Sequence, residues 1–179
     1  MCEIAGVVSA TPVEIPCSTT WRNAEDRSLA LVANGEIYNY RELRAKLETL
    51  GHCFATHSDC ETLLHDYEAW GIAFLDRLQG MFAFALHDAQ RCELILARDR
   101  LGIKPLYYCP DSRGLVFGSE IKALLPWLGK PEVDPQGLAQ LLQSNFTCAP
   151  RTLLQGVAKL PPAHLARIDT RALTMEVQA

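Results

Sequence analysis

Cys2 is the first residue of this chain whose chemistry could catalyse a reaction. It follows the initiator methionine, and removal of Met1 would leave a cysteine that carries a free α-amine. Such an amine titrates at about 7.7–8.0, so near neutral pH it can accept the proton of its own thiol. N-terminal cysteine, serine and threonine nucleophiles are activated in this way. On its position alone, a cysteine that is merely buried would be the simpler interpretation.

The motifs that follow Cys2 favour the catalytic interpretation. Residues 2–8, 34–44 and 58–61, in this order, resemble the class II glutamine amidotransferases, in which the mature chain begins at the catalytic cysteine. Longer segments downstream resemble the asparagine synthetase branch of that family in particular. These segments are residues 80–86, 97–108, 119–124 and 159–162, and the resemblance extends from residue 29 to about residue 169.

The resemblance implies a role for each residue of the site. Cys2 would attack the carboxamide carbon of glutamine, while the Asn34 side-chain amide and the Gly35 backbone N–H would form the oxyanion hole. One such donor typically lowers the barrier by roughly 3–4 kcal/mol. Glu36 and Asp59 would bind the α-ammonium group of the substrate. The alternatives are a plain hairpin turn at Asn34-Gly35 and, for Asp59, the first turn of a capped helix, where a carboxylate favours the helix dipole.

One part of the family pattern is missing. The family normally has a longer segment before Asn34, with a His-Arg-Gly-Pro-Asp motif whose arginine binds the α-carboxylate of glutamine, whereas this chain has only residues 9–28 there. Arg22 and Arg27 are the nearest replacements, but nothing in the local sequence supports them. Loss of one buried charge partner costs roughly 2–5 kcal/mol. We therefore expect this chain to bind and hydrolyse glutamine poorly or not at all.

Apolar runs and helical apolar spacing predict the elements that position these residues. Asn39 with Glu42 and Ser58 with Glu61 have the spacing of capping boxes, and Asp134 before a proline begins a later helix. Strands are expected at residues 4–9, 29–33, 81–86, 94–97, 105–109 and 114–117. Helices are expected at residues 39–51, 58–71, 119–125 and 134–142. Residues 164–168 and 173–177 are expected to form a final hairpin or the start of a linker.

Helices inserted among many strands indicate an α+β domain. The resemblance implies the fold of the N-terminal-nucleophile hydrolases, a four-layer αββα sandwich with Cys2 at a strand end inside a cleft. The short segment 9–28 implies that the sandwich is incomplete. We assign residues 1–169 to the class II glutamine amidotransferase domain, and residues 170–179 to the start of a linker toward a synthetase domain that is absent from this sequence.

The composition is typical of a soluble globular protein. Of the 179 residues, 49% are apolar and 21% are charged, and the net charge is −4. No basic cluster indicates nucleic acid or an anionic membrane as a partner, and no apolar stretch approaches the roughly 20 residues that cross a bilayer. Seven cysteines without a C-x-x-C pair, and no signal peptide, favour the reducing cytoplasm over a disulfide framework.

No metal and no cofactor are expected in this domain. The sequence has no glycine-rich phosphate loop, so ATP and Mg²⁺ are expected only in the synthetase domain. Cys53, His57 and Cys60 have a spacing seen in zinc sites, but no fourth ligand lies nearby, and a structural zinc site needs four. The Arg-Asp-Arg segment 98–100 is more typical of a structural network of salt bridges than of a catalytic site.

The leading hypothesis is an enzyme that hydrolyses glutamine to glutamate and ammonia for ATP-dependent amidation of aspartate by a synthetase domain. The alternative is an impaired or non-catalytic glutaminase-like module. A third hypothesis, a different reaction such as that of the related β-lactam or peptide-cyclising synthetases, is disfavoured because Asn34 and Glu36 are intact. The expected partners are glutamine and a C-terminal synthetase domain or its equivalent, and a homodimer stays open.

Overall fold

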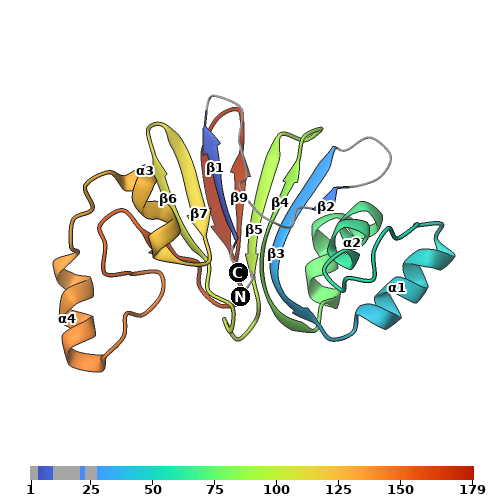
Figure 1. Ribbon diagram of the computed structural model, residues 1–179, viewed down its shortest axis with the longest axis horizontal. Coiled ribbons are helices and arrows are strands. Elements are labelled where there is room, and N and C mark those ends of the chain that lie inside the picture. Colours follow the sequence, from blue (N-terminus) through green and yellow to red (C-terminus); the bar gives the residue numbers. More distant parts are fainter. Residues whose placement is uncertain (1–3, 10–20, 23–27) are drawn as a thin grey trace.

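The computed structural model describes residues 4–9, 21–22 and 28–179, which form two antiparallel β-sheets with helices outside them (Figure 1). The strands are β1 (Ala5–Ser9), β2 (Trp21–Arg22), β3 (Leu29–Ile37), β4 (Gly80–Asp88), β5 (Glu93–Arg98), β6 (Tyr107–Asp111), β7 (Gly114–Gly118), β8 (Ala158–Lys159), β9 (Leu165–Asp169) and β10 (Thr174–Gln178). The helices are α1 (Tyr40–Thr49), α2 (Thr62–Trp70), the 3₁₀ helices η1 (Gly71–Arg77) and η2 (Ile121–Leu124), α3 (Leu125–Leu128) and α4 (Pro135–Ser144). One sheet has the strand order β1-β7-β6-β8, and the other has the order β10-β9-β5-β4-β3-β2.

Three clusters of buried apolar side chains hold the layers together. The first lies between the six-stranded sheet and the helices α1, α2 and η1, and it includes Leu31, Leu63 and Phe74. The second lies between the two sheets and includes Ile4 and Val32. The third packs η2 and α3 on the outer face of the four-stranded sheet. The layers therefore follow the order helix, sheet, sheet, helix, which confirms the predicted α+β sandwich (Figure 1). The expectation of an incomplete sandwich concerns a segment that lies mostly outside the described residues.

The expected turn at Asn34-Gly35 is wrong, because both residues lie inside β3. This strand runs four residues beyond the predicted end and pairs with β4 along its whole length. Gly35 lies opposite Phe82, and a Cβ atom at Gly35 would come within 2.3 Å of the Met81 carbonyl oxygen. The glycine is therefore needed because the two strands approach each other closely. From the sequence alone, a glycine required for this reason cannot be distinguished from one required by a turn.

Both predicted capping boxes are also wrong. The Asn39 side chain makes no bond to its own helix; its Nδ2 donates to the Arg77 carbonyl at 2.9 Å, and its Oδ1 accepts from the Gln79 N–H at 3.0 Å. Glu61 is itself the N-cap residue of α2, and its carboxylate accepts N–H groups of the preceding loop. In each case backbone groups outside the helix bind the side chain that the local pattern assigned to a helix end, in a distant segment for Asn39 and in the preceding loop for Glu61. The predicted cap of α4 is confirmed, since Asp134 Oδ1 accepts from the Gln136 N–H at 3.0 Å.

The last residues of the chain form an edge strand. β9 and β10 pair as an antiparallel hairpin, and β9 also pairs with β5, so residues 174–178 belong to the six-stranded sheet. The hairpin expected at the end of the chain is therefore present. Among the described residues, no helix is both long enough and apolar enough to cross a membrane.

The Arg-Asp-Arg segment binds backbone groups. Asp99 is 1% exposed, and its two carboxylate oxygens accept the N–H groups of Leu101, Ile103 and Lys104, each at 3.0 Å. The Arg98 guanidinium donates to the carbonyls of Gly102, Lys104 and Leu160 at 2.6–2.7 Å. The segment thus has the structural role expected for it, but it holds the loop after β5 through hydrogen bonds to backbone groups, whereas salt bridges were expected.

We expect Asp99→Asn to lower the free energy of unfolding by about 1–3 kcal/mol. The NH₂ group of the asparagine would replace a carboxylate oxygen that accepts a backbone N–H, so this N–H would lose its acceptor. Urea denaturation monitored by circular dichroism would measure the change. Asp76→Asn is the matched control, since Asp76 is exposed, and it should change the free energy by less than about 0.5 kcal/mol. Equal effects of the two substitutions would contradict this role.

Candidate functional site

The two faces of β3 meet different layers of the sandwich. Leu29, Leu31, Ala33 and Ile37 pack on the helix side, whereas Val32 packs between the sheets. Side chains alternate along a strand, so Asn34 and Glu36 share the inter-sheet face with Val32. The cross-strand partner of Asn34 is Ala83, which also belongs to the inter-sheet cluster.

The backbone N–H of Gly35 points away from β4, to the other edge of β3. Ile37 N–H donates to Asp59 Oδ2 at 2.7 Å, so the N–H of Ile37 is directed away from β4. In an antiparallel ladder the N–H groups of alternate residues point to the same edge, and Gly35 therefore shares this direction. The Cys60 thiol lies 3.9 Å from the Gly35 carbonyl oxygen on that edge. In the described part of the chain, β2 pairs with β3 only at Ala30 and Leu31, further toward the start of the strand.

Glu36 and Asp59 line one open cavity of about 590 Å³, which we call the Glu36–Asp59 pocket. The hydrogen bond from Ile37 fixes the Asp59 carboxylate at the end of β3. The structure therefore brings together the two carboxylates that the sequence predicted for one substrate group. The remaining residues that line the pocket are Ile37, Tyr38, Tyr40, Arg41, His57 and Ser58.

Arg41 is a cation in this pocket that the sequence analysis missed. It lies in the first turn of α1, directly after the strand that carries Glu36, and its Nε donates to the Tyr40 hydroxyl at 3.3 Å. The guanidinium is charged at neutral pH, as in any arginine, and this hydrogen bond raises its pKa further. The sequence contained a signal for it, since Arg41 directly follows the 34–40 motif, whereas the replacements considered were Arg22 and Arg27.

Several predicted residues lie where the structure gives no side-chain position. Cys2 and Arg27 are outside the described residues, and Arg22 is described only as part of β2. Ile4, two residues after Cys2, packs in the inter-sheet cluster together with Val32. Ile4, directly before β1, thus lies between the two sheets, and the face of β3 that carries Asn34 is turned to the same space.

The Cys53, His57 and Cys60 set does not form a metal-binding cluster among the described residues. Cys53 is exposed, while Cys60 is buried beside Gly35. Another set, His52, His65 and Glu68, does bring its donor atoms within 4.8 Å of one another.

The fold and this site define the chain's class. Residues 22–178 match the family described as a glutamine amidotransferase domain. The chain therefore belongs to the glutamine amidotransferase domain family. Within it, the chain is homologous to the corresponding part of the glutamine-hydrolysing asparagine synthetases.

Two curated relatives illustrate that homology. Asparagine synthetase [glutamine-hydrolyzing] 3 of Bacillus subtilis is 42% identical over 136 residues, which cover 75% of this chain and 22% of that protein. A putative asparagine synthetase [glutamine-hydrolyzing] of Mycobacterium tuberculosis is 44% identical over 150 residues, which cover 81% of this chain and 23% of that protein. The chain thus spans less than a quarter of the length of these relatives.

Solved structures show the same fold at low sequence identity. The glutamine phosphoribosylpyrophosphate amidotransferase of Bacillus subtilis superimposes with a TM-score of 0.64 at 18% identity, over 98% of this chain and 42% of that one. A glutamine aminotransferase class-II domain protein of Silicibacter pomeroyi gives a TM-score of 0.57 at 12% identity, over 99% of this chain and 97% of that one. These neighbours support the N-terminal-nucleophile hydrolase type of sandwich.

We expect Asp59→Ala to destabilise the domain by about 1–3 kcal/mol, because the Ile37 N–H would lose its acceptor at the end of β3. Asp59→Asn keeps an oxygen that can accept this hydrogen bond, so it should lose less than half as much. Denaturant unfolding of the two variants beside the unaltered chain would measure both values. Equal losses would show that the hydrogen bond does not position Asp59.

Proposed function

We propose that this domain hydrolyses the side-chain amide of glutamine to glutamate and ammonia. The observation that carries the proposal is that Glu36 and Asp59 line the same pocket. Glu36 directly follows Asn34 and Gly35 on β3. Two carboxylates favour the α-ammonium group of an amino acid, and the Gly35 N–H points to the edge of β3 where Asp59 is bound.

The proposed chemistry uses Cys2 as the nucleophile. The Cys2 thiol loses its proton to the α-amine and attacks the carboxamide carbon, and the negative charge on the carboxamide oxygen is stabilised by Asn34 and Gly35. Collapse of this intermediate breaks the C–N bond; the leaving nitrogen takes the proton and departs as ammonia, which leaves a thioester on Cys2. Water then hydrolyses the thioester to glutamate. The resemblance of residues 2–8 to the opening of the class II glutamine amidotransferases supports the role of Cys2.

We further propose that ammonia passes to a synthetase domain that amidates aspartate with ATP. The homology to glutamine-hydrolysing asparagine synthetases supports this partner. The cytoplasm is the proposed compartment. The cysteines in the described part of the chain are free thiols, which favours a reducing environment.

Arg41 is proposed to bind the α-carboxylate of glutamine. A zwitterionic amino acid places a carboxylate next to its ammonium group, and a pocket with two carboxylates alone would repel it. Arg41 lines the same pocket as Glu36 and Asp59, so it supplies the missing cation. A guanidinium can also pair bidentately with a carboxylate, which would align the substrate.

If the domain is a glutaminase, Cys2→Ala should abolish glutamate release from glutamine, because a chain has a single N-terminal residue and no other thiol or hydroxyl could use that residue's α-amine as its own base. Asn34→Ala should lower kcat by about a hundredfold or more and change KM less. The assay requires protein whose N-terminus is verified as Cys2. Cys53→Ala is the control, since this exposed thiol lies outside the Glu36–Asp59 pocket and should keep full activity.

The non-catalytic alternative predicts a different result for the unaltered chain. A binding module would take up glutamine in calorimetry and release no glutamate over hours. Full activity of Cys2→Ala would exclude the mechanism proposed here and leave the fold assignment untouched.

The role of Arg41 is tested by glutamine binding to the Cys2→Ala chain. Adding Arg41→Gln should weaken binding by at least about tenfold, because the α-carboxylate loses a charged partner. Arg171→Gln, at an exposed arginine outside the pocket, should leave the affinity within about twofold. Titration calorimetry measures all three dissociation constants. Unchanged affinity in the Arg41 variant would mean that another group binds the carboxylate.

A further inference from the structure

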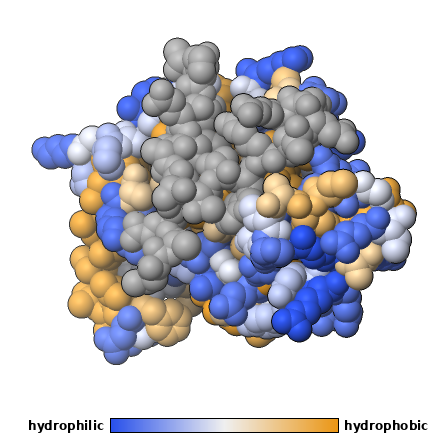
Figure 2. Space-filling model, turned by 45° about the vertical axis from the view of Figure 1, so that its right-hand side comes forward, coloured by the Kyte–Doolittle hydropathy of each residue, from blue (hydrophilic) through white to orange (hydrophobic). Residues whose placement is uncertain are grey.

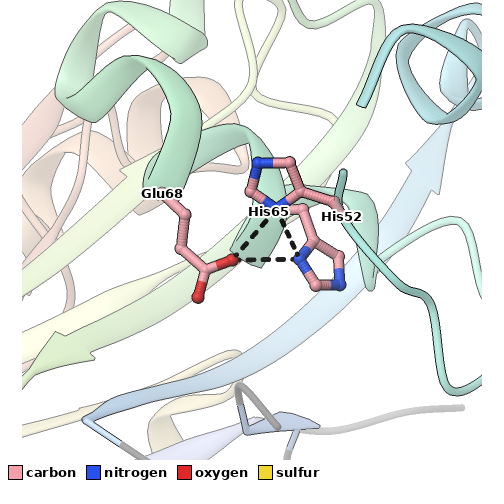
Figure 3. Close-up of side chains that lie close together, drawn as sticks. All are labelled: His52, His65 and Glu68. Carbon is pink, nitrogen blue, oxygen red and sulfur yellow. Dashed lines mark hydrogen bonds and ion pairs between the residues drawn. The ribbon is translucent and has the colours of Figure 1, made fainter. Parts of the chain in front are cut away.

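His52, His65 and Glu68 form a cluster that the proposed glutaminase chemistry does not use; we call it the His52 cluster. His65 and Glu68 lie three residues apart on one face of α2. His52 follows α1, where Gly51 adopts a φ of +95° and the His52 N–H donates to the Leu47 carbonyl at 3.1 Å. This glycine-dependent turn ends α1 and aims the chain toward α2. Figure 3 shows the three side chains pointing toward one another.

The three donor atoms form a small triangle. His65 Nδ1 lies 3.0 Å from Glu68 Oε2, His52 Nδ1 lies 3.4 Å from the same oxygen, and the two Nδ1 atoms are 3.3 Å apart (Figure 3). A tetrahedral zinc ion with ligand bonds of about 2.0–2.1 Å separates its ligand atoms by about 3.3 Å. The observed spacing therefore matches the edges of such a coordination shell.

Hydrogen bonding between neutral histidines leaves one contact of this triangle unfavourable. Suppose that one of the two Nδ1 atoms carries a proton and donates it to the other Nδ1 and to Glu68 Oε2. The unprotonated Nδ1 then faces Glu68 Oε2, and the lone pairs of these two atoms repel each other. If both Nδ1 atoms carry protons, both can donate to Glu68 Oε2, but the two N–H dipoles then lie side by side, with their nitrogens 3.3 Å apart. A proton on Glu68 leaves the two imidazole lone pairs opposed. A divalent cation at the centre would satisfy all three atoms together.

A carboxylate on the far side of His65 favours the tautomer that a metal needs. Glu61 Oε1 lies 3.8 Å from His65 Nε2, so it attracts the N–H to that nitrogen and leaves the Nδ1 lone pair directed at the cluster. Hydrogen bonds from the Thr56 hydroxyl and the N–H groups of Ala55 and Thr56 hold the Glu61 carboxylate in this position. Metal-binding histidines commonly have a carboxylate in this second position.

Asp66 is a buried carboxyl group beside the cluster. It is fully buried next to His65 in α2, and neither of its carboxylate oxygens has a hydrogen-bond partner among the described residues. Burial raises the pKa of Asp66 to about 7, while Arg77 and His65 act to lower it.

We propose that His52, His65 and Glu68 bind a divalent transition-metal ion, with Zn²⁺ as the ion whose geometry agrees best. Two imidazoles and a carboxylate are suited to zinc and its neighbours, whereas Mg²⁺ and Ca²⁺ prefer oxygen ligands alone. The side chains of His52 and Glu68 are 20% and 26% exposed, so water can reach the ion and fill the fourth position. The bound ion would tie the segment that follows α1 to helix α2.

Zinc binding to the full-length chain tests this proposal. Competition with a chromophoric chelator should show one Zn²⁺ per chain, and Co²⁺ should give the intense visible absorption of a four- or five-coordinate ion. His52→Gln and Glu68→Gln should each weaken Zn²⁺ binding by at least about tenfold, since each removes a ligand. Both residues are partly exposed, and circular dichroism verifies that the variants remain folded.

Matched controls separate this site from the other histidines and thiols. His57→Gln and Cys53→Ser alter exposed residues of the same segment that are not ligands, and both should keep the affinity within about twofold. The proposal is overturned by the absence of stoichiometric binding. It is equally overturned if His57→Gln or Cys53→Ser weakens binding as much as His52→Gln, because the ion would then lie elsewhere.

Discussion

The register between β3 and β4 is the constraint on which the rest of the site depends. β3 is buried on both faces, with Leu31 against the helices and Val32 between the sheets, so a slip of one residue would exchange the two sets of side chains. The close approach of Gly35 to Met81 and Phe82 on β4 excludes a larger residue at this point of the ladder. This register turns Asn34 and Glu36 toward the other sheet, and it turns the backbone N–H groups of Gly35 and Ile37 away from β4, to the edge where Asp59 is bound.

The sequence predicts a helix well where local signals decide it, as in α4, which begins with its Asp134 cap and Pro135. It fails where a local motif has a tertiary partner. Asn34-Gly35 has the composition of a turn, yet Gly35 is required because the β4 backbone leaves no room for a Cβ atom. Asn39 has the spacing of a capping residue, yet its amide binds the backbone on both sides of Leu78, at the carbonyl of residue 77 and the N–H of residue 79. Neither partner can be read from the neighbouring sequence.

The candidate site, too, could be predicted only where the sequence itself carries the signal. The resemblance predicted that Glu36 and Asp59 act together, and the structure places both in one pocket although they are 23 residues apart. Arg41 was not predicted, because its relevance depends on where α1 begins relative to the end of β3. The sequence analysis missed the His52 cluster for a related reason. The contact between His52 and His65 depends on the turn at Gly51 and on which side of α2 faces that turn. Spacing along the chain favoured Cys53 and His57 instead.

The segment between α1 and α2 shows how irregular backbone can be positioned as firmly as a strand. Three side chains hold it: His52 meets α2 at one end, Glu61 binds the Ala55 and Thr56 N–H groups at 2.7 Å, and Asp59 accepts from Ile37. The Arg44 guanidinium also donates to the Thr56 carbonyl and lies over the Phe54 ring. Because Asp59 lines the pocket, any change that loosens the other attachments displaces a carboxylate proposed to bind substrate. Stability of this segment and affinity of the pocket are therefore coupled through the same hydrogen bonds.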